Sequence, residues 1–300
     1  MKKRNLSDAQ AENSFGSSLK RKATYAALSI TWVIAKKAVR RFVISNLFLP
    51  RKYNTSTEEL QFLKEGQSFA FQSHGQKLAA WKWGAVGPII LVLHGWNGRG
   101  IQLMPIIREL LSWGFSVMTF DAPGHGDSEG IKSSYFQFTD ALRVFLQDDR
   151  WKIDGVVAHS LGGAAVINAL DKDHQSLVPI LIASPLYFKE LLFDAFDFHG
   201  VPSFIYKALM KEYEKKYKYS LEKDNPYALL SGIEQEIIMI HDVEDPVVPY
   251  IGIKEAAEKQ NKIRLITTNG LGHKALLHDR FVIDKIAEIL RRRLMESTVA

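Results

Sequence analysis

The sequence predicts an α/β fold in which a mostly parallel β-sheet is flanked by helices. From about residue 66, short apolar runs alternate with amphipathic segments, the pattern expected of buried parallel strands joined by helices. The alternation stops at Pro185, and about fifty residues pass before the next strand begins at Glu236. Such a stretch is too long for a loop. We therefore expect a helical cap at 185–235, inserted into a core formed by 66–184 and 236–300.

The pattern also predicts the individual elements of this core. The first two strands form a hairpin that turns at His74–Gly75, and the later strands are apolar runs that end at polar residues. The expected strands are 68–73, 77–83, 88–94, 116–121, 153–159, 178–184, 236–241 and 263–268. The expected helices are 102–113, 138–148, 160–170, 250–259 and 279–294.

Composition excludes several classes of protein. The chain of 300 residues has no cysteine, which excludes disulfides, thiolate catalysis and cysteine metal sites, and fits a reducing, cytoplasmic location. Residues 1–52 carry twelve Lys or Arg and two Asp or Glu, a net charge of +10, whereas the remainder has a net charge of −4. Because the body is acidic, we expect no nucleic-acid partner for it.

Residues 1–65 form a basic arm that is expected to contain an amphipathic helix. Its apolar run, 23–35, is shorter than the ~20 residues that span a bilayer, and no signal-peptide cleavage site follows. In the helix that ends before Pro50, basic and apolar side chains separate into two faces. These are Lys36, Lys37, Arg40 and Arg41 on one face, and Ala35, Val39, Phe42 and Val43 on the other. The apolar face either docks on the domain, or residues 20–49 attach peripherally to an anionic membrane.

The strongest functional signal is a serine between a buried strand and a helix. The apolar run 153–159 leads into Ser160, and the small residues Ala158, Gly162 and Gly163 surround it. A serine on such a sharp turn needs small neighbours, and its hydroxyl is lifted clear of the sheet at the start of the next helix. The composition predicts a catalytic nucleophile. The alternative is a serine that only caps the helix.

A serine hydroxyl is a weak nucleophile near neutral pH and needs a base that an acid orients. Asp245 lies in a tight turn after the next-to-last predicted strand, where Asp242 and Glu244 are alternatives for the acid. His273 lies in the glycine-rich loop after the last predicted strand and is the expected base. His278 is the alternative, but it sits where the final helix begins.

Two further turns complete a pattern of known type. His-Gly-Trp-Asn-Gly at 94–98 follows the first parallel strand, and Asp-Ala-Pro-Gly-His-Gly-Asp-Ser at 121–128 follows the second. With the serine turn and the acid and base loops, these segments resemble the α/β-hydrolase superfamily, in particular its monoglyceride-lipase and serine-aminopeptidase-like branch. The resemblance covers about residues 66–294. It departs from the usual G-x-S-x-G motif at Ala158, where the family has glycine.

The resemblance implies an eight-stranded sheet and specific site residues. The catalytic triad would be Ser160, Asp245 and His273, in the chain order usual for this fold. The oxyanion hole would use the backbone N–H groups of Leu161 and Trp96. The Trp96 ring either forms a wall of the acyl pocket or packs as a core aromatic. Asp121 precedes the serine in the chain, so we expect it to stabilise its own turn.

Residues and resemblance together predict a serine hydrolase that cleaves a small or medium acyl ester without a metal or organic cofactor. The same triad would also serve a thioesterase or a peptidase, and a non-catalytic binding protein with this fold is a third hypothesis. The segment 187–227 holds eleven of the 33 aromatic residues, which either contact an acyl substrate or form the core of the cap.

Overall fold

The computed structural model describes the backbone of residues 6–170 and 174–296, and the side chains of these residues except 6–17, 46 and 47. The first five residues of the predicted arm, and 171–173 and 297–300 of the predicted core, lie outside the described residues. The chain divides into two compact units, which we describe separately. The larger unit consists of 48–188 and 221–300, and the smaller unit of 1–47 and 189–220.

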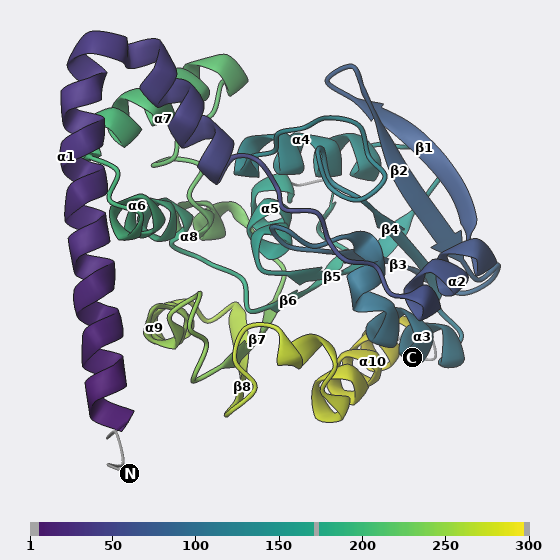
Figure 1. Ribbon diagram of the computed structural model, residues 1–300. Coiled ribbons are helices and arrows are strands. Elements are labelled where there is room, and N and C mark those ends of the chain that lie inside the picture. Colours follow the sequence, from purple (N-terminus) through teal and green to yellow (C-terminus); the bar gives the residue numbers. More distant parts are fainter. Residues whose placement is uncertain (1–5, 171–173, 297–300) are drawn as a thin grey trace. The chain divides into compact units, whose positions relative to one another are not determined.

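One eight-stranded sheet forms the centre of the larger unit and confirms the predicted fold class (Figure 1). Its strand order is β1-β2-β4-β3-β5-β6-β7-β8. The β2 strand pairs antiparallel with both β1 and β4, and all other neighbours are parallel. The strands are β1 (Gln67–Ser73), β2 (Gln76–Trp83), β3 (Ile89–Leu93), β4 (Ser116–Phe120), β5 (Ile153–His159), β6 (Val178–Ile182), β7 (Ile237–Asp242) and β8 (Ile263–Thr268).

Helices cover both faces of this sheet (Figure 1). On one face α4 packs against α5, and on the other α3 packs against α10. Side chains of each strand alternate between the faces: Ile90 and Val92 of β3 join the core cluster that includes α3 and α10, whereas Leu91 and Leu93 are buried outside that cluster. The helices of this unit are α2 (Thr57–Glu65), η1 (Gly100–Leu103), α3 (Met104–Ser112), α4 (Tyr135–Leu146), α5 (Leu161–Ala169), α8 (Pro226–Leu229), η3 (Leu230–Gly232), α9 (Tyr250–Lys259), η4 (Ala275–Leu277) and α10 (Arg280–Leu294).

Residues 48–65 belong to the larger unit, which differs from the predicted arm boundary at residue 65. They contain α2, whose start is fixed by a capping box between Ser56 and Glu59. Phe62 of α2 stacks on Trp83 with ring centroids 5.2 Å apart, and Leu63 joins the same core cluster. The sequence reasoning missed this helix because its apolar face is only two residues wide.

The smaller unit combines the N-terminal helix with two helices inserted between β6 and β7. These are α1 (Leu6–Leu47), which has a non-helical residue at Ala35, α6 (Phe188–Phe198) and α7 (Ser203–Tyr217). The sequence analysis treated the arm and the cap at 185–235 as separate regions, whereas the structure groups the arm helix with 189–220 and places 221–235 in the larger unit. Within the described residues, no helix combines the length and apolarity required to cross a membrane.

Candidate active site

Ser160 lies at the junction of β5 and α5 in a strained backbone conformation. Its φ of 52° and ψ of −122° are rare for a residue with a side chain, and such strain costs about 1–3 kcal/mol. The Ser160 N–H donates to the Ile182 carbonyl of β6 at 2.8 Å, which helps to hold the turn. Among the described residues the Ser160 hydroxyl makes no capping hydrogen bond to α5, so the helix-cap interpretation does not describe its side chain.

The small residues after Ser160 are required by close packing. A Cβ atom on Gly162 would lie 2.5 Å from the His94 carbonyl oxygen, and one on Gly163 would lie 1.9 Å from the Ser184 hydroxyl. Both distances are below van der Waals contact, so a larger residue would displace the turn. On the strand side, the methyl group of Ala158 is accommodated in the fully buried interior of β5.

His273 brings its ring directly beside Ser160. It lies in the loop after β8, which turns through Gly270 and Gly272 at positive φ. Its Nε2 is 3.0 Å from Ser160 Oγ, and its Nδ1 is 2.8 Å from Asp245 Oδ2. The structure therefore brings all three predicted triad side chains into one hydrogen-bonded chain, although they are far apart in the sequence.

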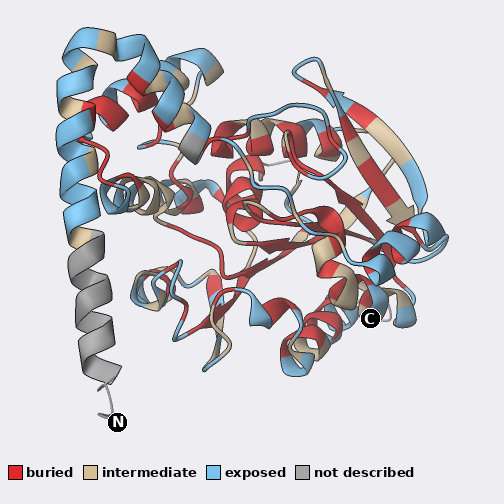
Figure 2. Ribbon diagram, in the orientation of Figure 1, coloured by how far each residue is buried: buried red, intermediate tan, exposed pale blue. Residues whose placement is uncertain are grey.

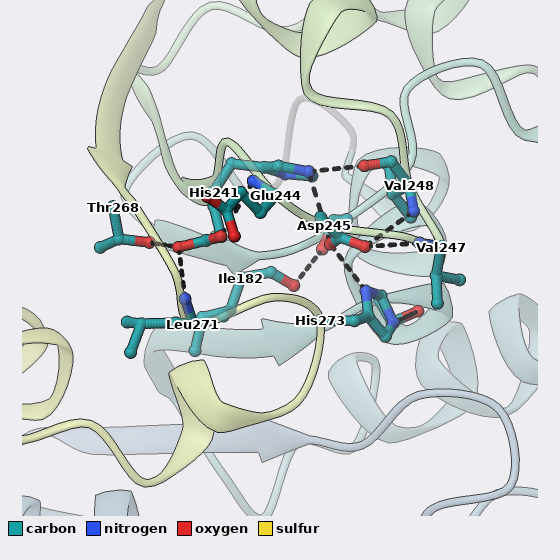
Figure 3. A network of polar contacts seen from close by, with 12 residues as sticks. Ile182, His241, Glu244, Asp245, Val247, Val248, Thr268, Leu271 and His273 are labelled. Carbon is teal, nitrogen blue, oxygen red and sulfur yellow. Dashed lines mark hydrogen bonds and ion pairs between the residues drawn. The ribbon is translucent and has the colours of Figure 1, made fainter. Parts of the chain in front are cut away.

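Asp245 is held as a carboxylate by its surroundings. Its second oxygen, Oδ1, accepts backbone N–H bonds from Val247 at 2.8 Å and Val248 at 2.9 Å. Burial would raise the pKa of Asp245, but the hydrogen bonds from His273 and from these N–H groups outweigh it, so the pKa is lowered. Figure 3 shows Asp245 between the rings of His241 and His273, and it is ionised at neutral pH.

The alternative acids and base have other positions. Asp242 accepts bonds from the Thr268 hydroxyl at 2.7 Å and the Leu271 N–H at 3.0 Å, so it ties the end of β7 to the loop that carries His273. Glu244 is exposed and donates its backbone N–H to Asp242. His278 is exposed at the end of η4. Only Asp245, of the three acidic residues, contacts the His273 ring within the described residues.

His241 is a part of this site that the sequence reasoning missed. Its Nε2 donates to the Val248 carbonyl at 2.9 Å and lies 3.5 Å from Asp245 Oδ2. Burial lowers the pKa of His241, so its ring is neutral, and Nδ1 has no hydrogen-bond partner among the described residues. The Nε2–H group of His241 thus faces the Asp245 carboxylate from the side opposite His273. The only sequence signal was a histidine four positions before the aspartate, at a strand end.

Three other buried histidines fix the loops around Ser160. Burial lowers the pKa of His94 to about 4 and the pKa values of His125 and His159 to about 3, so all three are neutral. His94 Nδ1 donates to the Gly95 carbonyl at 2.7 Å, and its Nε2 accepts from the Ala122 N–H at 3.0 Å. His159 Nε2 donates to the His273 carbonyl at 2.9 Å. His125 Nε2 accepts from the Asn97 N–H at 3.3 Å. Each ring therefore joins segments at the ends of different strands.

The loop after β3 passes directly beside Ser160. A Cβ atom on Gly95 would lie 2.8 Å from Ser160 Cβ, so only glycine allows this approach. The next residue, Trp96, has a half-buried ring packed edge-on against His125 at 5.3 Å. Leu161 is the first residue of α5 and is buried. Both residues predicted to donate oxyanion N–H groups thus adjoin Ser160 or the glycine that touches it.

Asp121 stabilises the turn after β4, as expected from its place in the chain. Its fully buried carboxylate accepts N–H bonds from Gly100 at 2.8 Å and from Asp127 at 2.9 Å, and a bond from Arg99 Nε at 3.2 Å. Arg99 also pairs with the Asp127 carboxylate. Sequence reasoning missed Arg99, because an arginine in a loop gives no local sign of its partner. Within 6–170 and 174–296, the structure has no cluster of three or more His, Asp or Glu side chains placed to hold a metal ion.

The comparisons with known proteins agree with this architecture. Residues 85–227 match the family model described as serine aminopeptidase, S33, a segment that contains Ser160 and the loop after β3 but neither Asp245 nor His273. The chain has the fold of the α/β hydrolases. Its matched segment is similar to the serine aminopeptidase group.

Among curated proteins, the chain is 28% identical over 179 residues to lysophosphatidylserine lipase ABHD12 from Gallus gallus, and 29% identical over 175 residues to the Rattus norvegicus protein of the same name. The first match covers 56% of this chain and 46% of the relative, and the second covers 54% and 43%. The matched segment thus spans less than half of each curated relative.

Among solved structures, the esterase Pf2001 from Pyrococcus furiosus aligns with a TM-score of 0.60 at 19% identity, covering 81% of this chain and 98% of that one. Mouse alpha/beta hydrolase domain-containing protein 10 aligns with a TM-score of 0.57 at 19% identity, covering 75% and 99%. At these identities the likeness establishes the fold.

Proposed function

We propose that this protein is a serine hydrolase that cleaves carboxylic esters through a covalent acyl-enzyme. The observation that carries the proposal is the continuous chain of contacts from Ser160 Oγ to His273 Nε2 at 3.0 Å and from His273 Nδ1 to Asp245 Oδ2 at 2.8 Å. Nucleophile, base and orienting acid are thus within hydrogen-bond reach of one another, as this chemistry requires.

In the proposed cycle, His273 Nε2 takes the hydroxyl proton as Ser160 Oγ attacks the carbonyl carbon of the ester. The proton then passes from His273 to the alkoxide, which leaves as an alcohol when the carbon–oxygen bond breaks. His273 next takes a proton from water, whose oxygen attacks the acyl carbon. His273 then gives this proton to Ser160 Oγ as the bond between the acyl carbon and Ser160 breaks, which releases the acid and free Ser160. Asp245 stays ionised throughout because its pKa is lowered, and it stabilises the imidazolium form of His273.

The oxyanion of each tetrahedral intermediate is assigned to two backbone donors. We assign one N–H to Leu161, at the positive end of α5, and one to Trp96, in the loop that touches Ser160 through Gly95. The strained backbone of Ser160 and the bonds made by His94 and His125 fix both loops before substrate binds. Removal of one such donor typically costs about 10²–10³-fold in kcat.

Acyl esters are the favoured substrate class. The curated relatives are named as lipases and one aligned structure as an esterase, which supports carboxylic esters over amides. The second candidate is a thioesterase or peptidase on the same triad, since the matching family is described as an aminopeptidase and another aligned structure, with a TM-score of 0.53, is a thioesterase domain. A non-catalytic binding protein is the third hypothesis, and an intact triad geometry speaks against it.

A substrate comparison tests the proposal. Purified protein would be given p-nitrophenyl esters, acyl-CoA thioesters and aminoacyl amides, with Ser160→Ala as the inactive variant and Ser231→Ala, an exposed serine of the same unit, as the matched control. We expect ester hydrolysis that Ser160→Ala abolishes and Ser231→Ala retains. Faster cleavage of thioesters or amides would replace the ester assignment, and no turnover in any class would favour the binding protein.

A further inference from the structure

In the smaller unit, α1 packs through one face against the inserted helices. The Trp32 ring meets Phe204 of α7 edge-on, with centroids 6.4 Å apart. Arg40 forms an ion pair with Glu212 of the same helix. Leu28 is buried before the non-helical residue Ala35, and Val39 and Val43 are buried after it. The amphipathic pattern predicted for the arm is therefore used for packing within the protein, although Phe42, expected on the same face, is 53% exposed.

The opposite face of α1 is also apolar, and it is exposed. Successive residues of a helix are rotated by about 100°, so Ile30 points about 200° away from Leu28, and the other members share its side. Figure 2 shows the described part of α1 as largely exposed. The large members of this apolar strip, with their exposed fractions, are Leu19 at 62%, Ile30 at 66%, Val33 at 81% and Ile34 at 82%.

Exposed cations lie at both ends of the apolar strip. Lys20 and Lys22 flank its start, and Lys36, Lys37 and Arg41 follow its end. The sequence has no Asp or Glu from residue 13 to residue 57 to offset them. The whole smaller unit contains sixteen Lys or Arg and seven Asp or Glu, a net charge of +9, against −3 for the larger unit. An apolar strip with cations at each end fits a surface that is both apolar and negatively charged.

We propose that this face of α1, on the segment that precedes the non-helical residue Ala35, docks on an anionic phospholipid bilayer, with that segment lying in the plane of the interface. The apolar strip would enter the boundary between headgroups and acyl chains, while the flanking lysines and Arg41 contact lipid phosphates and carboxylates. Contacts of Trp32 and Arg40 with α7 lie away from the apolar strip, so they leave the strip open to lipid. Charge complementarity favours a bilayer over a second copy of this chain, whose own smaller unit carries the same +9.

This surface has a consequence for the hydrolase unit. The chain crosses between the two units three times, at residues 47–48, 188–189 and 220–221. Docking of the smaller unit would therefore hold the larger unit at the bilayer by three covalent connections. The inference does not depend on the proposed reaction, because it rests on α1 alone.

Sedimentation of the full-length protein with vesicles tests the proposal. The vesicles would consist of phosphatidylcholine alone or of phosphatidylcholine mixed with phosphatidylserine, at low and high salt. We expect binding to the mixed vesicles that salt weakens, because screening shortens the reach of the charges. Val33→Asn/Ile34→Asn should lower the partition coefficient by about tenfold or more, and Lys36→Gln/Lys37→Gln by about tenfold.

The matched controls lie on the larger unit. Val86→Asn removes a side chain that is also 82% exposed, and Lys254→Gln/Lys259→Gln removes two exposed lysines from α9. Both should sediment like the unaltered protein. Equal binding of all variants, or no preference for anionic vesicles, would overturn the proposal. So would a fall in molecular mass of Val33→Asn/Ile34→Asn by light scattering without loss of vesicle binding, which would assign the strip to contact between copies. Fluorophosphonate labelling of the same variants should stay unchanged, which separates this result from the proposed reaction.

Discussion

The two compact units carry opposite net charge, and the larger one holds the network of buried, hydrogen-bonded histidines and aspartates. In the larger unit, His94, His159, Asp121, Asp242 and Asp245 are all buried and hydrogen-bonded. No buried histidine, aspartate or glutamate falls in the described part of the smaller unit, whose surface instead exposes aliphatic side chains between cations. The larger unit thus has the fixed polar geometry that bond-making chemistry needs, and the smaller unit has the surface that reversible adsorption needs.

The largest loss of activity should follow substitution of Ser160, the expected nucleophile of the larger unit. Ser160→Ala and Ser160→Gly should both lower ester hydrolysis by ~10⁴-fold or more, because the nucleophile is gone. The two variants should differ in stability, because glycine accepts the positive φ of this turn. The free energy of unfolding of Ser160→Gly should be about 1 kcal/mol higher than that of Ser160→Ala. Urea titration measures this difference. Equal stabilities would contradict the strained backbone of the turn.

The two aspartates at the end of β7 should separate catalysis from loop stability. Asp245→Asn leaves His273 without an anionic partner and should lower kcat by ~10⁴-fold. Asp242→Asn should lower kcat by about tenfold or less but reduce the free energy of unfolding by about 2 kcal/mol, because it breaks bonds between two loops. Ester turnover and urea titration of both variants give the comparison. A larger loss of kcat for Asp242→Asn than for Asp245→Asn would show that Asp242, and not Asp245, is the catalytic acid.

The buried neutral histidines should make the larger unit sensitive to acid. His94, His125 and His159 have lowered pKa values in the folded state, so below the unfolded value of 6.5 the unfolded chain binds more protons. Their contribution is fully present above pH 6.5 and is lost as pH falls toward about 4 for His94 and about 3 for His125 and His159. We expect a loss of about 1–2 kcal/mol per histidine between pH 7 and pH 5.

Urea titration at the two pH values measures the loss, and the matched variant is His125→Gln. Between pH 7 and pH 5, the unfolding free energy of this variant should fall by about 1–2 kcal/mol less than that of the unaltered protein. The same drop in both proteins would show that His125 is protonated in the folded state.

A smaller effect is expected at His241, which acts on Asp245 rather than on substrate. His241→Leu removes the Nε2–H that faces both Val248 and Asp245, and should lower kcat about tenfold with little change in KM. His241→Gln keeps an N–H donor and should recover most of the rate. A purely structural role would instead lower the unfolding free energy of both variants without separating their kcat values.

The sequence predicted the larger unit well because its signals are local. Apolar runs predicted every strand to within two residues of its observed ends, since buried parallel strands consist of little else. Ser160 stood directly after such a run, and Asp245 and His273 stood in the turns that follow two others. Parallel strands bring their carboxyl ends to one edge of the sheet, so these positions meet there without any further sequence signal.

The features that were missed depend on contacts between distant segments. Arg99 meets Asp121 from a different loop, and His241 acquires its role only because the turn after β7 folds back over its ring. The packing of α1 against α7 is of the same kind: the sequence showed an apolar face at 35–43 but not which helix α1 would contact. Local periodicity identifies faces, and only the tertiary structure identifies their partners.

The central claim is that Ser160 is a nucleophile activated by His273. A fluorophosphonate probe reacts with such a serine, and mass spectrometry of the digested protein locates the adduct. We predict a single adduct on the peptide that contains Ser160, absent after heat denaturation and in the His273→Ala variant. An unlabelled Ser160 in folded protein, or equal labelling without His273, would contradict the account.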